Sequence, residues 1–174
     1  MPLPIAGPPH EAPAASDFTW FIYGSSLDRE AFATWAKDHG HAPPDLSRGV
    51  RARLDGWRLA CDVPSRYWGG AVGTLVLAPG AHVEGLALPM PGAARALADH
   101  KEGAVSGLYR ALEVSVTPAG ASAPTTALAW LAAPERRLPA EAPPAEAWLE
   151  TVLRGARAAG LSPGWIGELE RLRG

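Results

Sequence analysis

Three strand-like segments follow one another between residues 51 and 90, with no helical segment between them. They are RARLDGWRLACDV (51–63), GGAVGTLVLAPG (69–80) and AHVEGLALPM (81–90), and each carries the alternating or continuous apolar pattern of a strand. Strands joined by short turns pair antiparallel, whereas parallel neighbours need a crossover of about a dozen residues or more. This order predicts an antiparallel sheet that closes toward a barrel, and it argues against a doubly wound α/β sheet.

The segments on either side of this sheet complete an α+β pattern. DFTWFIYGSS begins with a short, well-buried strand that stops at Gly24. We expect helices at 27–40, 91–103, 146–160 and 163–172, and strands at 107–118 and 125–134. We expect a single folded domain over residues 17–174, preceded by a flexible Pro/Ala-rich tail over residues 1–16.

Charge and composition exclude several classes of function. The 16 basic and 18 acidic residues give a net charge of −2, unlike the basic surface of a nucleic-acid-binding protein. No apolar run reaches the ~18 residues of a membrane span, and the first residues lack the basic-then-apolar order of a signal peptide. Cys61 is the one cysteine, which excludes an intramolecular disulfide and a cysteine-based zinc site. We therefore expect a cytoplasmic protein that binds neither nucleic acid nor membranes.

The segment FIYGSSL (21–27) indicates a sharp turn between a strand and a helix. Gly24 allows the turn, and consecutive backbone N–H groups in such a loop can point into one space that receives an oxyanion or a carboxylate. A plain turn in which a serine caps the helix is the alternative. The P-loop lysine and the G-x-S-x-G order are absent, so the segment is neither a P-loop nor a nucleophile elbow.

The histidines and the cysteine are weaker candidates. His39 and His41 flank Gly40 in a turn and could bind a metal, but no third ligand is evident, and surface or structural roles are favoured. Cys61 lies on a strand, where a small core residue is favoured over a cysteine nucleophile. We expect no metal site.

Glu102 lies at the end of a helical segment, directly before Gly103. A negative charge at a helix C-terminus is disfavoured by up to ~1 kcal/mol at exposed sites. If this carboxyl group is also partly buried, its pKa rises toward the range useful for proton transfer. An exposed charge in a loop is the alternative interpretation.

Five segments, taken together and in order, resemble the γ-glutamylcyclotransferase family. The family pattern begins with Tyr-Gly-Ser-Asn-Leu on the first strand, followed by a Gly-rich strand with Trp and a Val-x-Gly strand. It continues with an Asp-x-x-Glu-Gly turn, a Tyr on the next strand and a closing Gly-Ala-x-x-x-Gly-Leu-Pro segment. The likeness covers residues 18–172. The matching segments are FIYGSSL, ARLDGWRLAC, YWGGAVGTLVLAPGAHVEGLAL, LADHKEGAVSGLYR and AWLETVLRGARAAGLSPGWIGEL.

The resemblance implies a small barrel of mixed and antiparallel strands, flanked by helices and holding one pocket. It implies an enzyme, a carbon–nitrogen lyase or acyltransferase, that converts a small γ-glutamyl substrate into 5-oxoproline and a free amine or amino acid without a metal or organic cofactor. The family's catalytic glutamate, a general base and acid, matches Glu102. The substrate-binding residues match Tyr23, Gly24, Ser25, Ser26, Leu27, Asp99 and Tyr109. The chain is expected to be a monomer or a homodimer.

Departures from the family pattern bear on the identity of the substrate. Ser26 stands where the family has Asn, which removes an amide donor. Trp148 stands where many members carry a Tyr, so we expect it at the substrate site without a hydroxyl group. Arg66 and Tyr67 could shape a different leaving-group pocket.

Two other interpretations remain. The same reaction could remove a γ-glutamyl protecting group late in a biosynthetic pathway, which the changes at Ser26 and Trp148 suggest. A chain of this fold could instead be a non-catalytic module that binds an acidic metabolite or a protein partner. The intact pair of Glu102 and Asp99 favours an enzyme over such a module.

Overall fold

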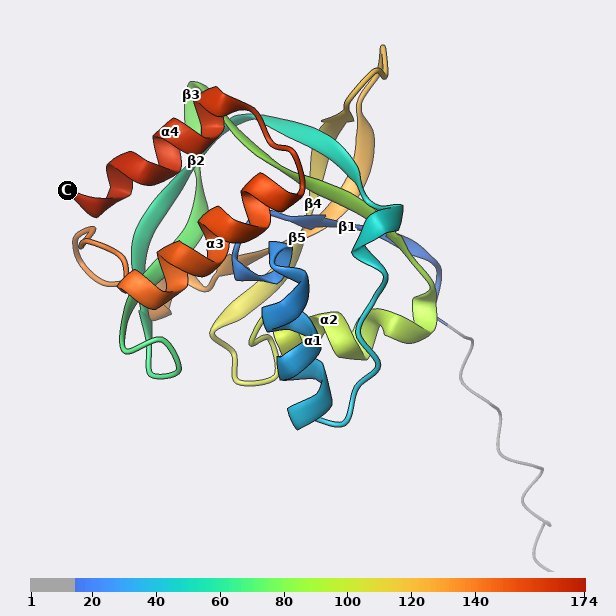
Figure 1. The fold of residues 1–174 in the computed structure, drawn as a ribbon, viewed down its shortest axis with the longest axis horizontal. Helices are drawn as coiled ribbons and strands as arrows, with labels where there is room; N and C mark the ends of the chain where they lie inside the picture. The colour runs from blue at the N-terminus through green and yellow to red at the C-terminus, as the bar shows by residue number, and fades with distance from the viewer. Residues whose placement is uncertain (1–14) are drawn as a thin grey trace, which may run out of the picture.

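Five strands close into a barrel in the computed structural model, which describes residues 15–174 (Figure 1). The strand order is β1-β3-β2-β4-β5, and β1 closes the barrel by pairing parallel with β5 while every other pair is antiparallel. The predicted α+β barrel of mixed strands is therefore confirmed. The strands are β1 (Phe18–Ile22), β2 (Val50–Ser65), β3 (Gly70–Met90), β4 (Tyr109–Pro118) and β5 (Thr125–Ala132). The tail expected over residues 1–16 falls outside the described residues for 1–14.

The prediction of two separate strands at 69–80 and 81–90 is wrong. One strand, β3, runs through both, because β2 and β3 bend together instead of turning back. Pairing passes from Asp55 opposite His82 to Trp57 opposite Leu77, which leaves Gly56 against the four residues 78–81. Gly56 and Gly80 take φ values of +81° and +86° at this irregularity, a conformation that suits glycine. Pro79 is tolerated there because the ladder is already interrupted.

Within residues 15–174, four α-helices cover the barrel, close to the predicted positions. They are α1 (Arg29–Asp38), α2 (Arg95–Lys101), α3 (Glu146–Ala158) and α4 (Pro163–Glu170). Helix α1 begins later than expected because a 3-10 turn, Ser25–Leu27, precedes it and Asp28 caps it by accepting a hydrogen bond from the Ala31 N–H at 2.7 Å. In Figure 1, α3 and α4 lie together above, and α1 and α2 lie below. No helix within residues 15–174 is long and apolar enough to span a membrane.

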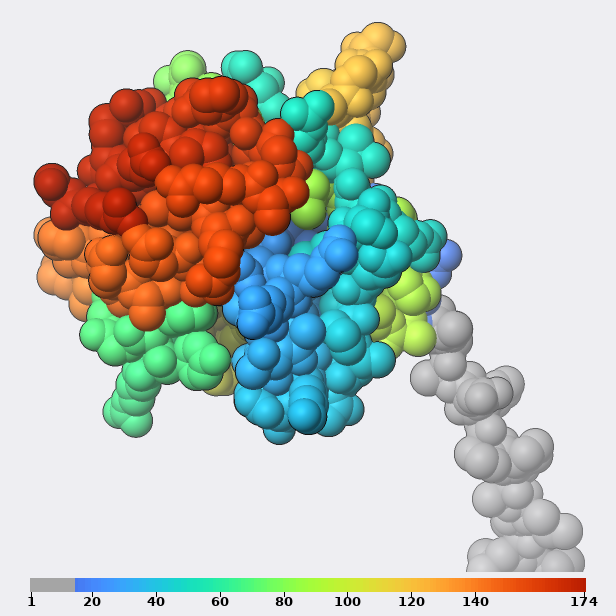
Figure 2. All heavy atoms as spheres, viewed as in Figure 1, coloured from blue at the N-terminus to red at the C-terminus, as the bar shows by residue number. Residues whose placement is uncertain are grey.

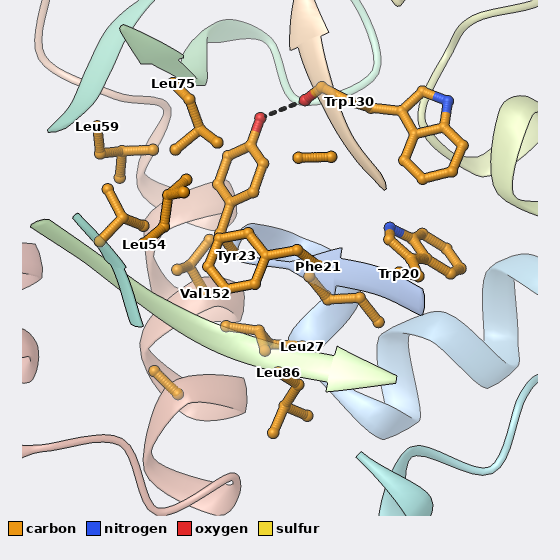
Figure 3. Close-up of a cluster of buried hydrophobic side chains, with 14 of the residues drawn as sticks. Trp20, Phe21, Tyr23, Leu27, Leu54, Leu59, Leu75, Leu86, Trp130 and Val152 are labelled. Atoms are coloured by element: carbon orange, nitrogen blue, oxygen red, sulfur yellow. Dashed lines mark hydrogen bonds between the residues drawn. The ribbon is translucent and has the colours of Figure 1, made fainter. Parts of the chain in front are cut away.

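Strand β1 is the centre of the hydrophobic core. Trp20, Phe21 and Ile22 are each at most 1% exposed, because the barrel lining covers one face of the strand and helices cover the other. Figure 3 shows Phe21 and Tyr23 among aliphatic side chains of β2, β3 and α3. Gly85 of β3 lies so close to β1 that a Cβ there would be 2.2 Å from the Ile22 carbonyl oxygen. This tight pairing fixes where β1 ends, and the loop that follows opens into a cavity.

Candidate active site

A cavity of about 290 Å³ lies where the end of β1, the end of α2 and the turn between β2 and β3 meet. Figure 2 shows the green β2–β3 turn beside the blue α1, with a recess between them. Buried side chains, among them Trp20, Trp130 and Trp148, form much of the wall. Of the predicted site residues, the cavity lining includes Tyr23, Gly24, Ser25, Glu102, Tyr109 and Trp148.

Gly24 and Ser25 line this cavity with backbone N–H groups that have no hydrogen-bond acceptor in the described residues. The 3-10 turn that follows uses their carbonyl groups, since the Leu27 N–H donates to Gly24 O at 3.0 Å and the Asp28 N–H donates to Ser25 O at 3.2 Å. Within residues 15–174, the N–H groups of Gly24 and Ser25 themselves reach no backbone or side-chain acceptor. A Cβ on Gly24 would meet no atom within 4 Å. The loop therefore faces open space with two available hydrogen-bond donors.

Tyr23 points into the barrel core and is one of the residues that line the cavity. Its hydroxyl donates to the Trp130 carbonyl oxygen at 2.5 Å (Figure 3). Burial is the main cause that raises the pKa of this phenol well above its usual value. Tyr23 therefore stays protonated and acts as a hydrogen-bond donor, not as a base.

Ser26 and Leu27 have different surroundings from the rest of the loop. The Ser26 hydroxyl donates to Oε1 of Glu102 at 2.8 Å, and Leu27 is buried in the core instead of lining the cavity. Helix α3 presses on this turn at Gly155, where a Cβ would lie 2.5 Å from the Asp28 nitrogen. The structure thus brings the loop and Glu102 together and leaves Leu27 as a packing residue.

Glu102 is the C-cap of α2, as the pattern DHKEG predicts, and its side chain lines the cavity while being partly buried. Burial raises the pKa of its carboxyl group, while the nearby Lys101 ammonium and the hydrogen bond from Ser26 oppose that rise. The net direction is upward. A carboxyl group in this position can accept and return a proton closer to neutral pH than a free glutamate can.

Asp99 lies one turn earlier on α2 and is not part of the cavity wall. Its carboxylate accepts hydrogen bonds from Arg95 Nε at 3.1 Å and from Trp130 Nε1 at 2.9 Å. Trp130 does line the cavity. Asp99 therefore contributes indirectly, because its hydrogen bond positions the Trp130 indole in the cavity wall.

Tyr109 and Trp148 both lie against Gly73 in the cavity wall. The Tyr109 hydroxyl donates to the Gly73 carbonyl oxygen at 2.7 Å, and burial raises the pKa of this phenol. A Cβ on Gly73 would lie 2.7 Å from the Trp148 indole, so the strand needs glycine at this position. The Trp148 ring fills the space and offers an apolar surface to a ligand.

Several residues of the cavity wall were not predicted from the sequence. They include Trp35 of α1, His100 and Lys101 of α2, Ser65 at the end of β2, and Trp68 in the turn between β2 and β3. Lys101 was detectable, since it directly precedes Glu102 in the same motif. Tyr67 was expected, whereas its neighbour Arg66 does not line the cavity.

The other candidates lie outside this chemistry. His39 stacks on Trp35 with ring centroids 4.5 Å apart, and His41 Nε2 lies 2.9 Å from His100 Nδ1. Within the described part of the chain, no three His, Cys, Asp or Glu side chains are grouped to hold a metal ion. Cys61 is buried, and burial raises the pKa of its thiol to about 12, so it is not an activated nucleophile.

Comparisons with known proteins agree with this architecture. The sequence model of the AIG2-like family matches residues 82–169, a span that includes Glu102 and Trp148. No curated protein matches the chain. A human protein titled uncharacterized protein loc79017 is 24% identical with a TM-score of 0.72, covering 89% of this chain and 87% of that one. A structure titled gamma-glutamyl cyclotransferase is 23% identical with a TM-score of 0.73, with the same coverage.

A third structure, YkqA from Bacillus subtilis, is 25% identical with a TM-score of 0.74. The match covers 90% of this chain but only 54% of YkqA, so this chain corresponds to about half of that protein. All three likenesses extend over nearly the whole described barrel and its helices. They show a shared fold.

Proposed function

Because the chain belongs to the AIG2-like family and shares the fold of a protein named gamma-glutamyl cyclotransferase, we propose that it is an enzyme that cyclises a γ-glutamyl amide. In this reaction the α-amino nitrogen of the glutamyl group attacks its own γ-carbonyl carbon. The lactam C–N bond of 5-oxoproline forms, the original amide C–N bond breaks, and a free amine or amino acid leaves. The observation that carries the proposal is the hydrogen bond of 2.8 Å between Ser26 and Glu102 at the cavity.

Glu102 acts as the proton carrier in this proposal. The α-amine must lose a proton to attack, and the departing amine must gain one, so one carboxyl group can accept the first proton and return it to the leaving nitrogen. Burial is the main cause of the raised pKa of Glu102. The higher pKa makes the carboxylate a better acceptor for the proton of the α-amine. Since the nucleophile belongs to the substrate, the chain needs no activated serine or cysteine.

The backbone donors of Gly24 and Ser25 stabilise negative charge on the substrate. Both residues line the cavity, their N–H groups have no acceptor within residues 15–174, and such donors can bind the oxyanion of the tetrahedral intermediate or the glutamyl α-carboxylate. Ser26 contributes by orienting the Glu102 carboxylate through its hydroxyl. The resemblance assigned this loop to substrate binding, and the geometry supports that role for its first residues.

The deciding experiment measures 5-oxoproline release by mass spectrometry from a panel of γ-glutamyl amides. We expect turnover by the wild type and a loss of at least ~10²-fold for Glu102→Gln, the size typical of a lost general acid–base group. The matched control is Glu113→Gln, which changes an exposed glutamate on β4, and it should retain full activity.

Each alternative predicts a different result of the same experiment. Equal activity of Glu102→Gln and wild type would overturn the role of Glu102. Binding of γ-glutamyl compounds without turnover of any panel member would favour the non-catalytic module. A strong preference for a large γ-glutamyl-protected intermediate over simple γ-glutamyl amino acids would favour the biosynthetic variant of the reaction.

A further inference from the structure

Lys101 is the one Lys or Arg side chain among the described residues that line the cavity. The chain contains just two lysines, Lys37 and Lys101, and its other basic residues are arginines. Lys37 is exposed on α1, whereas Lys101 is partly buried at the end of α2, directly before Glu102. The cationic side chain of Lys101 thus lines the same cavity as Glu102, the proposed proton carrier.

The Lys101 ammonium has aromatic neighbours and no carboxylate partner. Its Nζ lies 5.3 Å from the Trp35 ring centroid and 5.4 Å from the Phe32 ring centroid. Within residues 15–174, no Asp or Glu oxygen lies within 4.0 Å of it. Burial lowers the pKa of this ammonium group, and the Glu102 charge opposes that shift.

The buried acidic residues elsewhere in the fold show a different arrangement. Asp28 pairs with Arg154, and Asp62 pairs with Arg137, both with N–O distances of 2.5 Å. Each of these charges is compensated within the chain, as buried charges usually are. Lys101 is not, and Glu102 accepts its hydrogen bond from Ser26 instead.

Aromatic contacts hold a cation in place without neutralising it. The rings of Trp35 and Phe32 attract the ammonium electrostatically, so the side chain is positioned while its N–H donors remain free for an anion. Lysine also suits this position because its charge is compact. A position in the last turn of α2 explains a basic residue there, but it does not explain why the side chain lines the cavity.

We propose that Lys101 binds a carboxylate of the substrate in this cavity, an inference that rests on the proposed γ-glutamyl cyclisation. A γ-glutamyl amino acid carries two such groups, the glutamyl α-carboxylate and the carboxylate of the leaving amino acid. Both offer the same chemistry to an ammonium group. Gly24 and Ser25 line the same cavity, and their backbone amides can receive the other carboxylate.

The test compares wild type, Lys101→Gln and Lys101→Arg on γ-glutamyl-alanine and on γ-glutamyl-alaninamide, whose leaving group carries no carboxylate. We expect Lys101→Gln to raise KM for γ-glutamyl-alanine by about 10- to 100-fold, the range for a lost hydrogen bond between charged groups, with kcat changed by less than about threefold at a pH where Glu102 is deprotonated in both proteins. Lys101→Arg should recover part of the loss. Lys37→Gln is the matched control and should behave as wild type.

The two substrates identify which carboxylate Lys101 binds. If the KM increase occurs with both substrates, Lys101 binds the glutamyl α-carboxylate, and if it disappears with the alaninamide, Lys101 binds the carboxylate of the leaving amino acid. A KM for Lys101→Gln within twofold of wild type on both substrates would overturn the proposal. So would a fall in kcat alone, and thermal unfolding of each variant separates these results from a loss of folding.

A calorimetric measurement separates this proposal from the proposed function. The probe is γ-glutamyl-alanine, titrated into Glu102→Gln and into the double variant Glu102→Gln/Lys101→Gln. Binding that weakens about 10-fold or more in the double variant supports carboxylate recognition even if the wild type releases no 5-oxoproline. Turnover by the wild type with no dependence on Lys101 would overturn only this proposal. If the wild type shows no turnover and no binding of the probe is detected, both proposals are overturned.

Discussion

At the scale of single residues, opposing effects set the pKa of the Glu102 carboxyl group. Burial raises the pKa of its carboxyl group, and the Lys101 charge and the Ser26 hydroxyl lower it. A proton carrier needs this balance, because a carboxyl group that is too acidic cannot accept the proton of an amine and one that is too basic is already protonated. Ser26 is therefore more than a shortened version of the family's Asn, since its hydroxyl stabilises the carboxylate form.

We expect Ser26→Ala to shift the acidic limb of the pH dependence of kcat/KM to higher pH. Activity rises as Glu102 loses its proton, and the Ser26 hydrogen bond lowers the pKa of that carboxyl group, so removing the bond raises the pKa and delays the rise. The measurement is a pH–rate profile for both proteins. Ser115→Ala, an exposed position on β4, is the control, and an unchanged or lower limb for Ser26→Ala would contradict this account.

At the scale of secondary-structure elements, the contact between α3 and the 3-10 turn Ser25–Leu27 fixes the position of the loop at the site. Gly155 lets α3 approach the turn until the helix backbone nearly touches Leu27 and Asp28. Arg154 then pairs with Asp28, which also caps α1. One face of α3 thereby fixes the loop that presents the Gly24 and Ser25 donors.

Gly155→Ala should destabilise the protein and weaken catalysis together. The added Cβ would lie 2.5 Å from the Asp28 nitrogen and from the Leu27 carbonyl carbon, so α3 must move away, at a cost of about 1–3 kcal/mol. Thermal unfolding and 5-oxoproline release measure the two effects.

Gly164→Ala is the matched control within α4. Its Cβ would approach only the Ser162 Oγ, at 3.7 Å, and alanine favours a helix over glycine by up to ~1 kcal/mol. This variant should be as stable as the wild type or more so. If Gly155→Ala were equally harmless, the close contact between α3 and the turn would not control the loop.

One hydrophobic core joins the barrel to the helices at the scale of the whole molecule. Trp20 and Trp130 of the barrel, Trp148 of α3 and Trp165 of α4 all belong to it. A structure that shares one core unfolds as a unit. The predicted single domain over residues 17–174 depends on this cooperativity.

Unfolding by urea should therefore show one transition. Tryptophan fluorescence reports on the barrel, α3 and α4, and far-UV circular dichroism reports on the backbone, so their midpoints should coincide. An earlier fluorescence transition would mean that the C-terminal helices separate from the barrel first, and the single-domain prediction would then be wrong.

Much of the local structure could be predicted because short-range patterns determine it. Ser162 followed by Pro163 started α4 as expected, since the cap and the proline act within one turn. Glu102 at the end of α2 was likewise readable from the residues around it. Pro79-Gly80 misled the prediction because a Pro-Gly pair indicates a turn, and only the matching irregularity at Gly56 of β2 allows the strand to continue.

By itself, the sequence determined the helices, most of the strands, the barrel class and the segments that carry the candidate site. The tertiary structure alone decided the parallel closure of β1 on β5 and the direction of each side chain. Asp99 lies outside the cavity wall and binds the Trp130 indole. Leu27 packs in the core, and Lys101 lines the cavity. These directions depend on packing between segments far apart in the chain, which no local pattern records.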